Sequence, residues 1–248
     1  MNDSQSGYLG LSKKDKSRLL MDMVMRMVMH YGFWFGEVRH QMGMEPALDM
    51  MDTVTPKAMK IAMHRMAETL GFAMQDDLPK ALSDMDEDLM NRCLQDLAKN
   101  WLVMDGVWFQ TVESAHGMND AKRCNDSCWG KFSPYEAHGI KKFLELGKNP
   151  GLTGLKKALA FRMYSFINTQ SIVDEGPQSF VFQMNACRVQ AARKRKGMPD
   201  YPCKTAGLVE YTYFARAIDP RIKTACIGCP PDPHPDEWFC AWRFTIEQ

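Results

Sequence analysis

The sequence lacks a charge excess of either sign, because 31 lysines and arginines stand against 30 aspartates and glutamates. Proteins that bind nucleic-acid phosphates or anionic membranes usually carry a basic excess. We therefore predict no nucleic-acid partner and no membrane partner. The first residues also lack the basic, apolar and small-residue order of a signal peptide, which favours a cytoplasmic location.

Long apolar runs, internal repeats and low-complexity linkers are missing from the sequence as well. A membrane-spanning helix needs about 20 apolar residues. The most apolar helical stretch, Met21 to Met29, is much shorter and contains Asp22 and Arg26. The hydrophobic content of 45% in 248 residues is nevertheless enough to bury a core. The chain is predicted to form one large or two small globular domains.

Methionine is abundant, with 21 residues that recur mostly at helical spacing. Flexible thioethers of this kind fill an adaptable helical core or pocket, and the spacing counts against a thioether copper site. Because charges barely interrupt the Met21–Met29 stretch, its helix is expected to be central or to lie at a subunit interface. A homodimer is compatible with this pattern.

Helical periodicity dominates residues 1–100, beginning at a cap on Ser12. Two apolar runs, 101–104 and 107–112, then flank an Asp-Gly dipeptide that is typical of tight hairpin turns. Ser133-Pro134-Tyr-Glu136 has the pattern of a capping box that opens a helix. Further strands are predicted at 163–173, 179–184, 221–225 and 237–246, with helices at 186–196 and 206–217.

These patterns predict an α+β fold. A helical part, residues 1–100, is packed on an antiparallel-sheet part, residues 101–248, that binds the metal and the ligand. The two parts form either separate domains or one continuous domain.

Five of the eight cysteines fall between residues 187 and 240. In a reducing cytosol, such thiols are metal ligands or reactive groups more often than disulfides. Cys226 and Cys229 form a Cys-x-x-Cys pair, and Cys203 and Cys240 can complete a four-thiolate set. Zinc is favoured because four thiolates are a usual structural zinc site. A 4Fe-4S cluster uses the same ligands and is the alternative cofactor.

Cys187 is the surplus thiol of this region. Basic residues follow it at Arg188 and at 193–196, and nearby cations lower the pKa of a thiol. If the protein has a reaction, Cys187 is the predicted nucleophile, with Glu210 or His234 as candidate bases. The alternatives are a buried structural thiol or a fifth member of the metal set.

A second pair, Cys124 and Cys128, lies near His116 and His138 in the sequence. The spacing permits a second metal site, but no further Cys-x-x-Cys pair accompanies it. The role of this pair stays open.

The carboxy-terminal part resembles the 4-vinyl-reductase domain, which also serves as a sensor in bacterial transcription activators. The resemblance rests on Tyr201-Pro202-Cys203, the helix at 207–211, the strand ending in Cys226 and the strand beginning at Cys240. It implies an α+β ligand-binding fold with zinc held by cysteines and a glutamate near the end of the sheet. Cys203, Cys226 and Cys240 match the cysteines of that pattern. Lys223 stands near the position of the glutamate, and Cys229 is expected to replace it.

The whole chain is more similar to an uncharacterised family of bacterial and archaeal cytosolic proteins placed near the L-2-amino-thiazoline-4-carboxylic acid hydrolases. The similarity is carried by four short segments: Cys187-Arg-Val-Gln190, Glu210-Tyr211, Ile218-Asp-Pro-Arg221 and Cys229-Pro-Pro-Asp232. The resemblance implies a hydrolase relationship without a defined activity.

Together these observations predict a cytosolic metal-binding protein that binds a small molecule. The alternatives are a small-molecule hydrolase that uses Cys187 or the metal, and an iron–sulfur electron carrier. Whether the protein is an enzyme is left open by the sequence.

Overall fold

The computed structural model describes residues 7–247 and contains two compact units, Met1–Asp84 and Met85–Gln248. None of the helices in this described range has the length and apolar content needed to cross a membrane. The second unit contains the cysteine-rich region.

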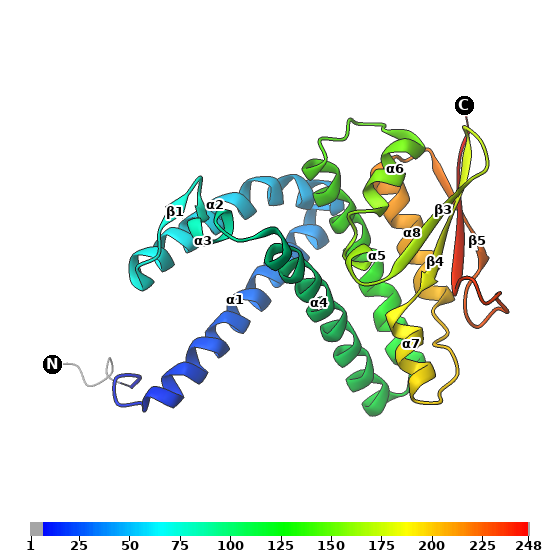
Figure 1. Cartoon of the computed structure of the whole chain (residues 1–248). Helices are drawn as coiled ribbons and strands as arrows, with labels where there is room; N and C mark the ends of the chain where they lie inside the picture. Colours follow the sequence, from blue (N-terminus) through cyan, green and yellow to red (C-terminus); the bar gives the residue numbers. More distant parts are fainter. Residues whose placement is uncertain (1–6, 248) are drawn as a thin grey trace. The chain divides into compact units, whose positions relative to one another are not determined.

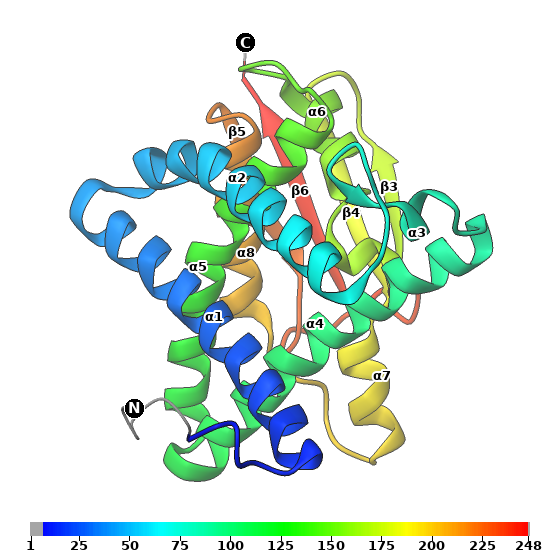
Figure 2. The same ribbon diagram turned by 90° about the vertical axis from the view of Figure 1, so that its left-hand side faces the viewer.

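The first unit is built on two long helices that are joined at Gly43 and diverge from it (Figures 1 and 2). Its elements are α1 (Lys13–Met42), α2 (Met44–Leu70), β1 (Met74–Gln75), β2 (Leu78–Pro79) and α3 (Lys80–Ser83). The predicted cap at Ser12 is confirmed, since its side chain accepts a hydrogen bond from the Asp15 backbone N–H. Gly43 adopts a φ of +97°, a conformation that favours glycine at the junction.

Burial in the first unit is sparse. None of the 30 described residues of α1 is buried, and α2 buries Ala47, Leu48 and Ala67. One polar contact between the two helices joins Tyr31 Oη to Thr55 Oγ1 at 2.7 Å. The apolar surface of α1 is therefore left largely exposed.

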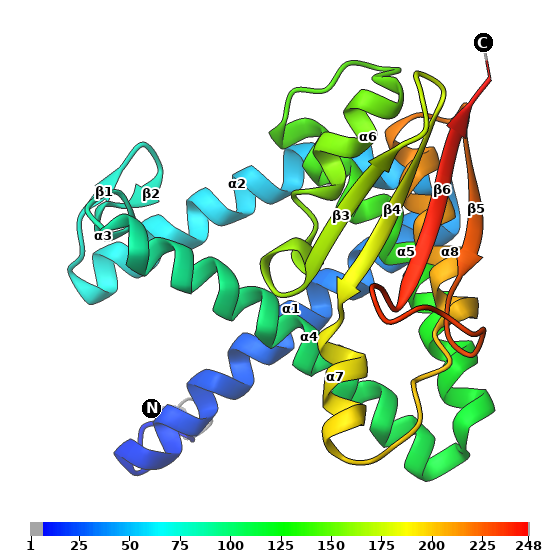
Figure 3. The same ribbon diagram turned by 45° about the vertical axis from the view of Figure 1, so that its right-hand side comes forward.

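The second unit contains helices and one four-stranded antiparallel sheet in the order β3-β4-β6-β5 (Figure 3). Its elements are α4 (Glu87–His116), α5 (Met118–Phe143), α6 (Gly151–Leu159), the 3₁₀ helix η2 (Met163–Phe166), β3 (Thr169–Asp174), β4 (Ser179–Ala186), α7 (Arg188–Arg195), α8 (Lys204–Ile218), β5 (Ile222–Gly228) and β6 (Cys240–Ile246). The predicted α+β class is confirmed, as are the strands beginning near 179 and 221 and the helices near 186 and 206.

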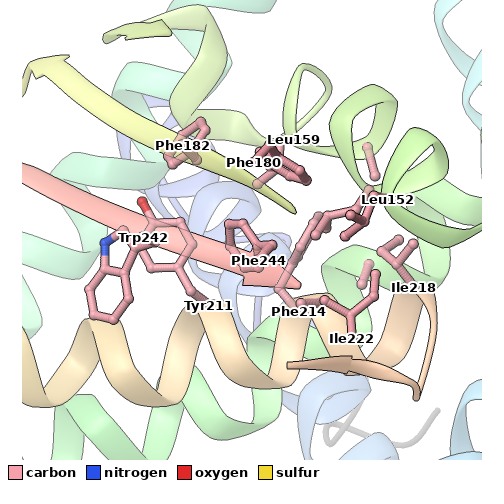
Figure 4. Close-up of a cluster of buried hydrophobic side chains, with 14 of the residues drawn as sticks. Leu152, Leu159, Phe180, Phe182, Tyr211, Phe214, Ile218, Ile222, Trp242 and Phe244 are labelled. Carbon is pink, nitrogen blue, oxygen red and sulfur yellow. The ribbon is translucent and has the colours of Figure 1, made fainter. Parts of the chain in front are cut away.

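The core of this unit lies between the sheet and α8, with α6 at one end (Figure 4). Its large buried side chains include Phe180, Phe182, Tyr211, Phe214, Ile218, Trp242 and Phe244. A Cβ atom on Gly207 would lie 2.5 Å from Cζ2 of Trp242, which is too close for any other residue. The first turns of α8 are thereby held directly against β6.

The predicted hairpin at 101–112 is wrong, because these residues lie in the middle of α4. Trp101 packs against Trp129 and Tyr164, with ring centroids 5.9 and 4.9 Å apart. Asp105, predicted to be in the turn, instead accepts a hydrogen bond from Asn125 of α5. Tertiary packing along one helical face has outweighed the local turn signal.

The predicted capping box at Ser133 is also wrong. Ser133 and Pro134 are buried within α5, which continues without interruption from Met118 to Phe143. Glu136 points into the core, where it pairs with Arg162. A carboxylate expected at a helix end therefore belongs to the interior of the unit.

Candidate metal centre

Five cysteines gather at one end of the sheet, where strand ends meet the N-termini of two helices. Cys187 precedes α7, Cys203 precedes α8, Cys226 and Cys229 lie at the end of β5, and Cys240 begins β6. All five belong to the core cluster or pack against it. The fold brings together every cysteine that the sequence singled out in this region.

Three of these thiols are neighbours. Cys203 Sγ and Cys229 Sγ lie 3.5 Å apart, and Cys240 is near enough to Cys229 to help raise the pKa of the Cys229 thiol. Two sulfurs bound at about 2.3 Å to a tetrahedral zinc would be about 3.8 Å apart. The spacing of Cys203 and Cys229 is close to this value, so these two thiols have the chemistry and the separation of a pair that shares one zinc ion.

Cys226 and Cys187 lie near two of these thiols, Cys203 and Cys240. Burial raises the pKa of Cys226 and of Cys187, and the charges of Cys203 and Cys240 contribute to the rise in both cases. The structure therefore offers two neighbouring thiols, Cys226 and Cys187, as the fourth ligand of the trio.

The thiols of the trio are unequal as acids. The hydrogen bond from Cys229 lowers the pKa of Cys203, and the same bond raises the pKa of Cys229. Cys203 also stands at the N-terminus of α8, where the helix dipole favours a negative charge. In the metal-free protein, Cys203 is thus the thiol of this pair that ionises more readily.

Gln190 of α7 fixes the segment that precedes Cys203. Its side chain is buried, accepts a hydrogen bond from the Tyr201 N–H at 2.8 Å and donates one to the Tyr201 carbonyl at 3.0 Å. Gln190 Nε2 also lies 3.6 Å from Cys203 Sγ. The segment from Cys187 to Gln190 therefore positions Cys203.

The loop after Cys229 is attached to the start of α8. The Lys204 N–H donates to the Pro230 carbonyl at 2.9 Å, and Lys204 Nζ lies 2.7 Å from Asp232. The Asp232 N–H closes the turn on the Cys229 carbonyl. These contacts hold Cys229 beside Cys203. The segment from Cys229 to Asp232 therefore helps to form the cysteine cluster.

Cys187 does not show the lowered pKa that its basic neighbours led us to expect. Burial raises the pKa of its thiol to about 12. Arg188, its nearest basic neighbour, donates its backbone N–H to Asn168 Oδ1. The role of Cys187 as a nucleophile stays a prediction, and its thiol is protonated at neutral pH in the metal-free protein.

Glu210 lies in a buried ion cluster that joins three helical segments. Arg162, which is 2% exposed, places Nε 2.9 Å from Glu136 Oε2 and Nη1 2.6 Å from Glu210 Oε1. Glu136 Oε1 also accepts a hydrogen bond from the Met163 N–H. One guanidinium thus faces two carboxylates in the interior of the second unit.

Burial raises the pKa of Glu210 to about 7, although the Arg162 charge acts in the opposite direction. Glu136 and Asp105 add to the rise. Two ionised carboxylates beside one guanidinium leave a net negative charge in the core, and protonation of Glu210 removes it. For Arg162, the charges of Glu136 and Glu210 outweigh burial and keep its pKa above the ordinary value.

We expect this carboxyl group to make stability depend on pH. Its folded pKa is about 7 and lies above the ordinary value of 4.5. The stabilisation is therefore complete below about pH 4.5 and is lost as the pH rises through 7. Between pH 6 and 8 the free energy of unfolding should fall by roughly 1 kcal/mol more in the wild type than in Glu210→Gln.

Urea unfolding of both proteins at the two pH values measures this difference. The same comparison with Glu175→Gln is the control, because Arg243 holds the pKa of the exposed Glu175 low, at about 2, outside this range. Parallel pH profiles for the wild type and Glu210→Gln would contradict the assignment.

The remaining predicted positions are distributed over α4, α5 and the loop that precedes β6. Cys124 and Cys128 are exposed on α5, while His116 ends α4. His234 Nε2 lies 3.0 Å from Asp200, and its pKa is raised by the Pro235 carbonyl and by that carboxylate. His234 is thus held by contacts of its own loop region.

Three residues that contact the candidate site residues or their partners were not predicted to do so from the sequence: Arg162, Glu136 and Gln190. Arg162 and Glu136 have no local motif, because their pairing spans 26 residues. Gln190 ends the quoted segment that begins at Cys187, but its role depends on the fold. Between residues 7 and 247, no three His, Cys, Asp or Glu side chains stand ready to coordinate an ion, so the metal prediction is not tested by the structure.

The fold and the site define an α+β protein in which a cysteine cluster closes one end of an antiparallel sheet. The chain belongs to the family described as "Family of unknown function (DUF6125)", which it matches over residues 80–246. No curated protein and no solved structure matches the chain. Family membership brings no activity with it, so the relationships to 4-vinyl reductases and to thiazoline hydrolases stay predictions.

Proposed function

We propose that the protein binds zinc through Cys203, Cys226, Cys229 and Cys240 and uses the surrounding unit to bind a small molecule. The observation that carries this proposal is the contact of Cys203 with Cys229 and the proximity of Cys240, three thiols contributed by three separate segments. Four thiolates leave no open position, so the ion would be structural. A cytoplasmic location, where thiols stay reduced, belongs to the same proposal.

The resemblance to the zinc-bearing 4-vinyl-reductase domain supports this proposal at three positions, Cys203, Cys226 and Cys240. The fourth ligand of that pattern, a glutamate, is replaced. Lys223, which stands near its position, is exposed on the sheet and pairs with Glu247. Cys229 lies against Cys203 instead, in agreement with its proposed place in the set.

The small-molecule part of the proposal is supported by an aromatic group beside the buried ions. Trp129 and Tyr164 stack at a centroid distance of 5.7 Å, and Trp101 packs against both. The Arg162 guanidinium lies 6.0 Å from the ring centroid of Trp129 and 5.6 Å from that of Tyr164, and its Nη2 amino group has no hydrogen-bond partner in the described part of the chain. Apolar walls with a few buried polar groups are typical of ligand sites.

A hydrolase is the second candidate function, and Glu210 is the observation that favours it. A carboxyl group with a pKa of about 7 can accept or donate a proton at neutral pH. The negative charge of Glu210 acts to raise the pKa of both Cys203 and Tyr164. The charge of Cys187 also acts to raise the pKa of Tyr164. The substrate class taken from the resemblance is a small heterocycle with an amide-like bond.

Metal analysis of protein purified without oxygen, together with its visible spectrum, tests the proposal. We expect about one zinc per chain and no absorption in the visible range. Brown protein with about four irons per chain would show that the site holds an iron–sulfur cluster and not zinc. Protein purified without any bound metal, and unable to take up zinc under reducing conditions, would overturn the proposal.

A further inference from the structure

The first unit contains a long apolar surface that its own residues meet only towards its carboxy-terminal end, where Tyr31 contacts Thr55 of α2. Large apolar side chains of α1 from Leu20 to Trp34 are between 38% and 66% exposed. Because α1 and α2 diverge from Gly43, α2 does not lie along the amino-terminal half of α1 (Figure 2). A surface of this kind normally has a partner.

The most regular part of this surface is a stripe that we call the α1 seam, made of Leu20, Val24, Met27, Tyr31 and Trp34. Successive members are four and three residues apart, which is the spacing at which two helices pack along each other. At about 100° per residue, Asp22 and Arg26 lie on the opposite side of the helix. These two residues pair with each other, so the seam itself carries no charge.

We propose that the α1 seam binds the α1 seam of a second copy of the chain and forms a homodimer. The area fits this partner. At roughly 200 Å² per large side chain, the five seam residues, 38–64% exposed, offer about 550 Å² per copy, so that two copies together reach the roughly 1,000 Å² that a specific interface needs. An uncharged seam with regular spacing is complementary to itself, as a two-fold interface requires.

The sparse core of the first unit points to the same permanent partner. Its three buried residues, Ala47, Leu48 and Ala67, form too small a core to hold 84 residues together. A second copy is present wherever the chain is made. An anionic membrane surface fits less well, because helices that bind one carry basic residues along the polar face, whereas Arg26 beside the seam is paired with Asp22 and the three lysines of α1, Lys13, Lys14 and Lys16, all precede the seam.

The test compares three full-length proteins by light scattering coupled to size-exclusion chromatography. The wild type is expected at twice the chain mass of 28.4 kDa. Val24→Glu places two charges in the seam and should weaken association by roughly a hundredfold or more, so that it elutes as a monomer. Arg26→Glu places a glutamate on the opposite side of the helix and should remain dimeric.

A monomeric wild type at micromolar concentration would overturn the proposal. So would a dimeric Val24→Glu, or an Arg26→Glu that dissociates as readily. Anionic vesicles mixed with monomeric wild type would then show whether a membrane surface covers α1 instead.

Methionine oxidation of the wild type keeps the proposal testable if Val24→Glu fails to fold. Met27 belongs to the seam, while Met29 lies about 140° from Val24, towards the charged side. Under mild peroxide, Met27 should be oxidised at least several times more slowly in the dimer than in diluted monomer, with little change at Met29. Equal reactivity of Met27 in both states, or protection of Met27 in a protein that is only monomeric, would overturn the proposal.

Discussion

Replacement of Cys229 by serine is expected to remove bound zinc and to lower the melting temperature by more than about 10 °C. Cys229 contacts Cys203 and has a pKa that both Cys203 and Cys240 raise, so its loss breaks the trio at its centre. Binding of structural zinc is coupled to folding with apparent free energies of about 10 kcal/mol or more. Metal content and thermal unfolding of the purified variant measure the two effects.

Serine and cysteine are similar in size, so most of the change in melting temperature should come from the loss of the ion. Metal-free wild type is therefore a matched control. Wild-type protein stripped of metal by a chelator should melt at nearly the same temperature as Cys229→Ser, since both lack the ion. Cys124→Ser, an exposed position on α5, should keep its zinc and its melting temperature. Full zinc content in Cys229→Ser would remove Cys229 from the ligand set.

The same assay identifies the fourth ligand. Cys226→Ser is expected to lose zinc, and Cys187→Ser is expected to retain it. The reverse result would exchange the two residues in the proposed set and would leave the trio of Cys203, Cys229 and Cys240 unchanged.

The second large effect is expected from Arg162→Met. Its removal leaves Glu136 and Glu210 buried without a cation, and breaking a buried ion pair in this way costs about 3–5 kcal/mol. Both carboxyl groups can escape by binding protons, so the loss should be larger at pH 8 than at pH 6. Urea unfolding at both pH values gives the free energies.

A triple variant separates lost charge from lost packing. Arg162→Met with Glu136→Gln and Glu210→Gln contains no buried charge at these three positions and should recover most of the stability. Arg243→Met is the exposed control, because Arg243 pairs with Glu175 at the surface and should contribute at most about 1 kcal/mol. A triple variant no more stable than Arg162→Met alone would show that the cluster acts through packing.

The parts of the site that could be predicted are those with a local pattern. Cys226 and Cys229 are three residues apart, and this spacing alone is enough to suggest a metal ligand pair. The strands and helices around it could also be placed, because apolar alternation and helical spacing are clear there. Cys203 and Cys240 are predicted as ligands because a four-thiolate site needs two thiols besides this pair. The fold does bring them together.

The parts that failed depend on distant contacts. Asp105 and Gly106 form a good turn pair in isolation, but Trp101 finds its aromatic partners on α5 and η2 only if the helix continues. Glu136 has the spacing of a capping residue, but its carboxylate is buried in the core, where it pairs with Arg162, 26 residues away in the sequence. No window of sequence contains both members of such a pair.

The hydrogen bond from Gln190 to Cys203 has a consequence for the electronic character of any bound metal. An N–H group directed at a thiolate withdraws electron density from sulfur, so Cys203 donates less charge to the ion than a thiolate without such a bond. In a zinc site this makes the sulfur a poorer nucleophile and protects it against alkylation and oxidation. In an iron–sulfur cluster, the same amide would raise the reduction potential.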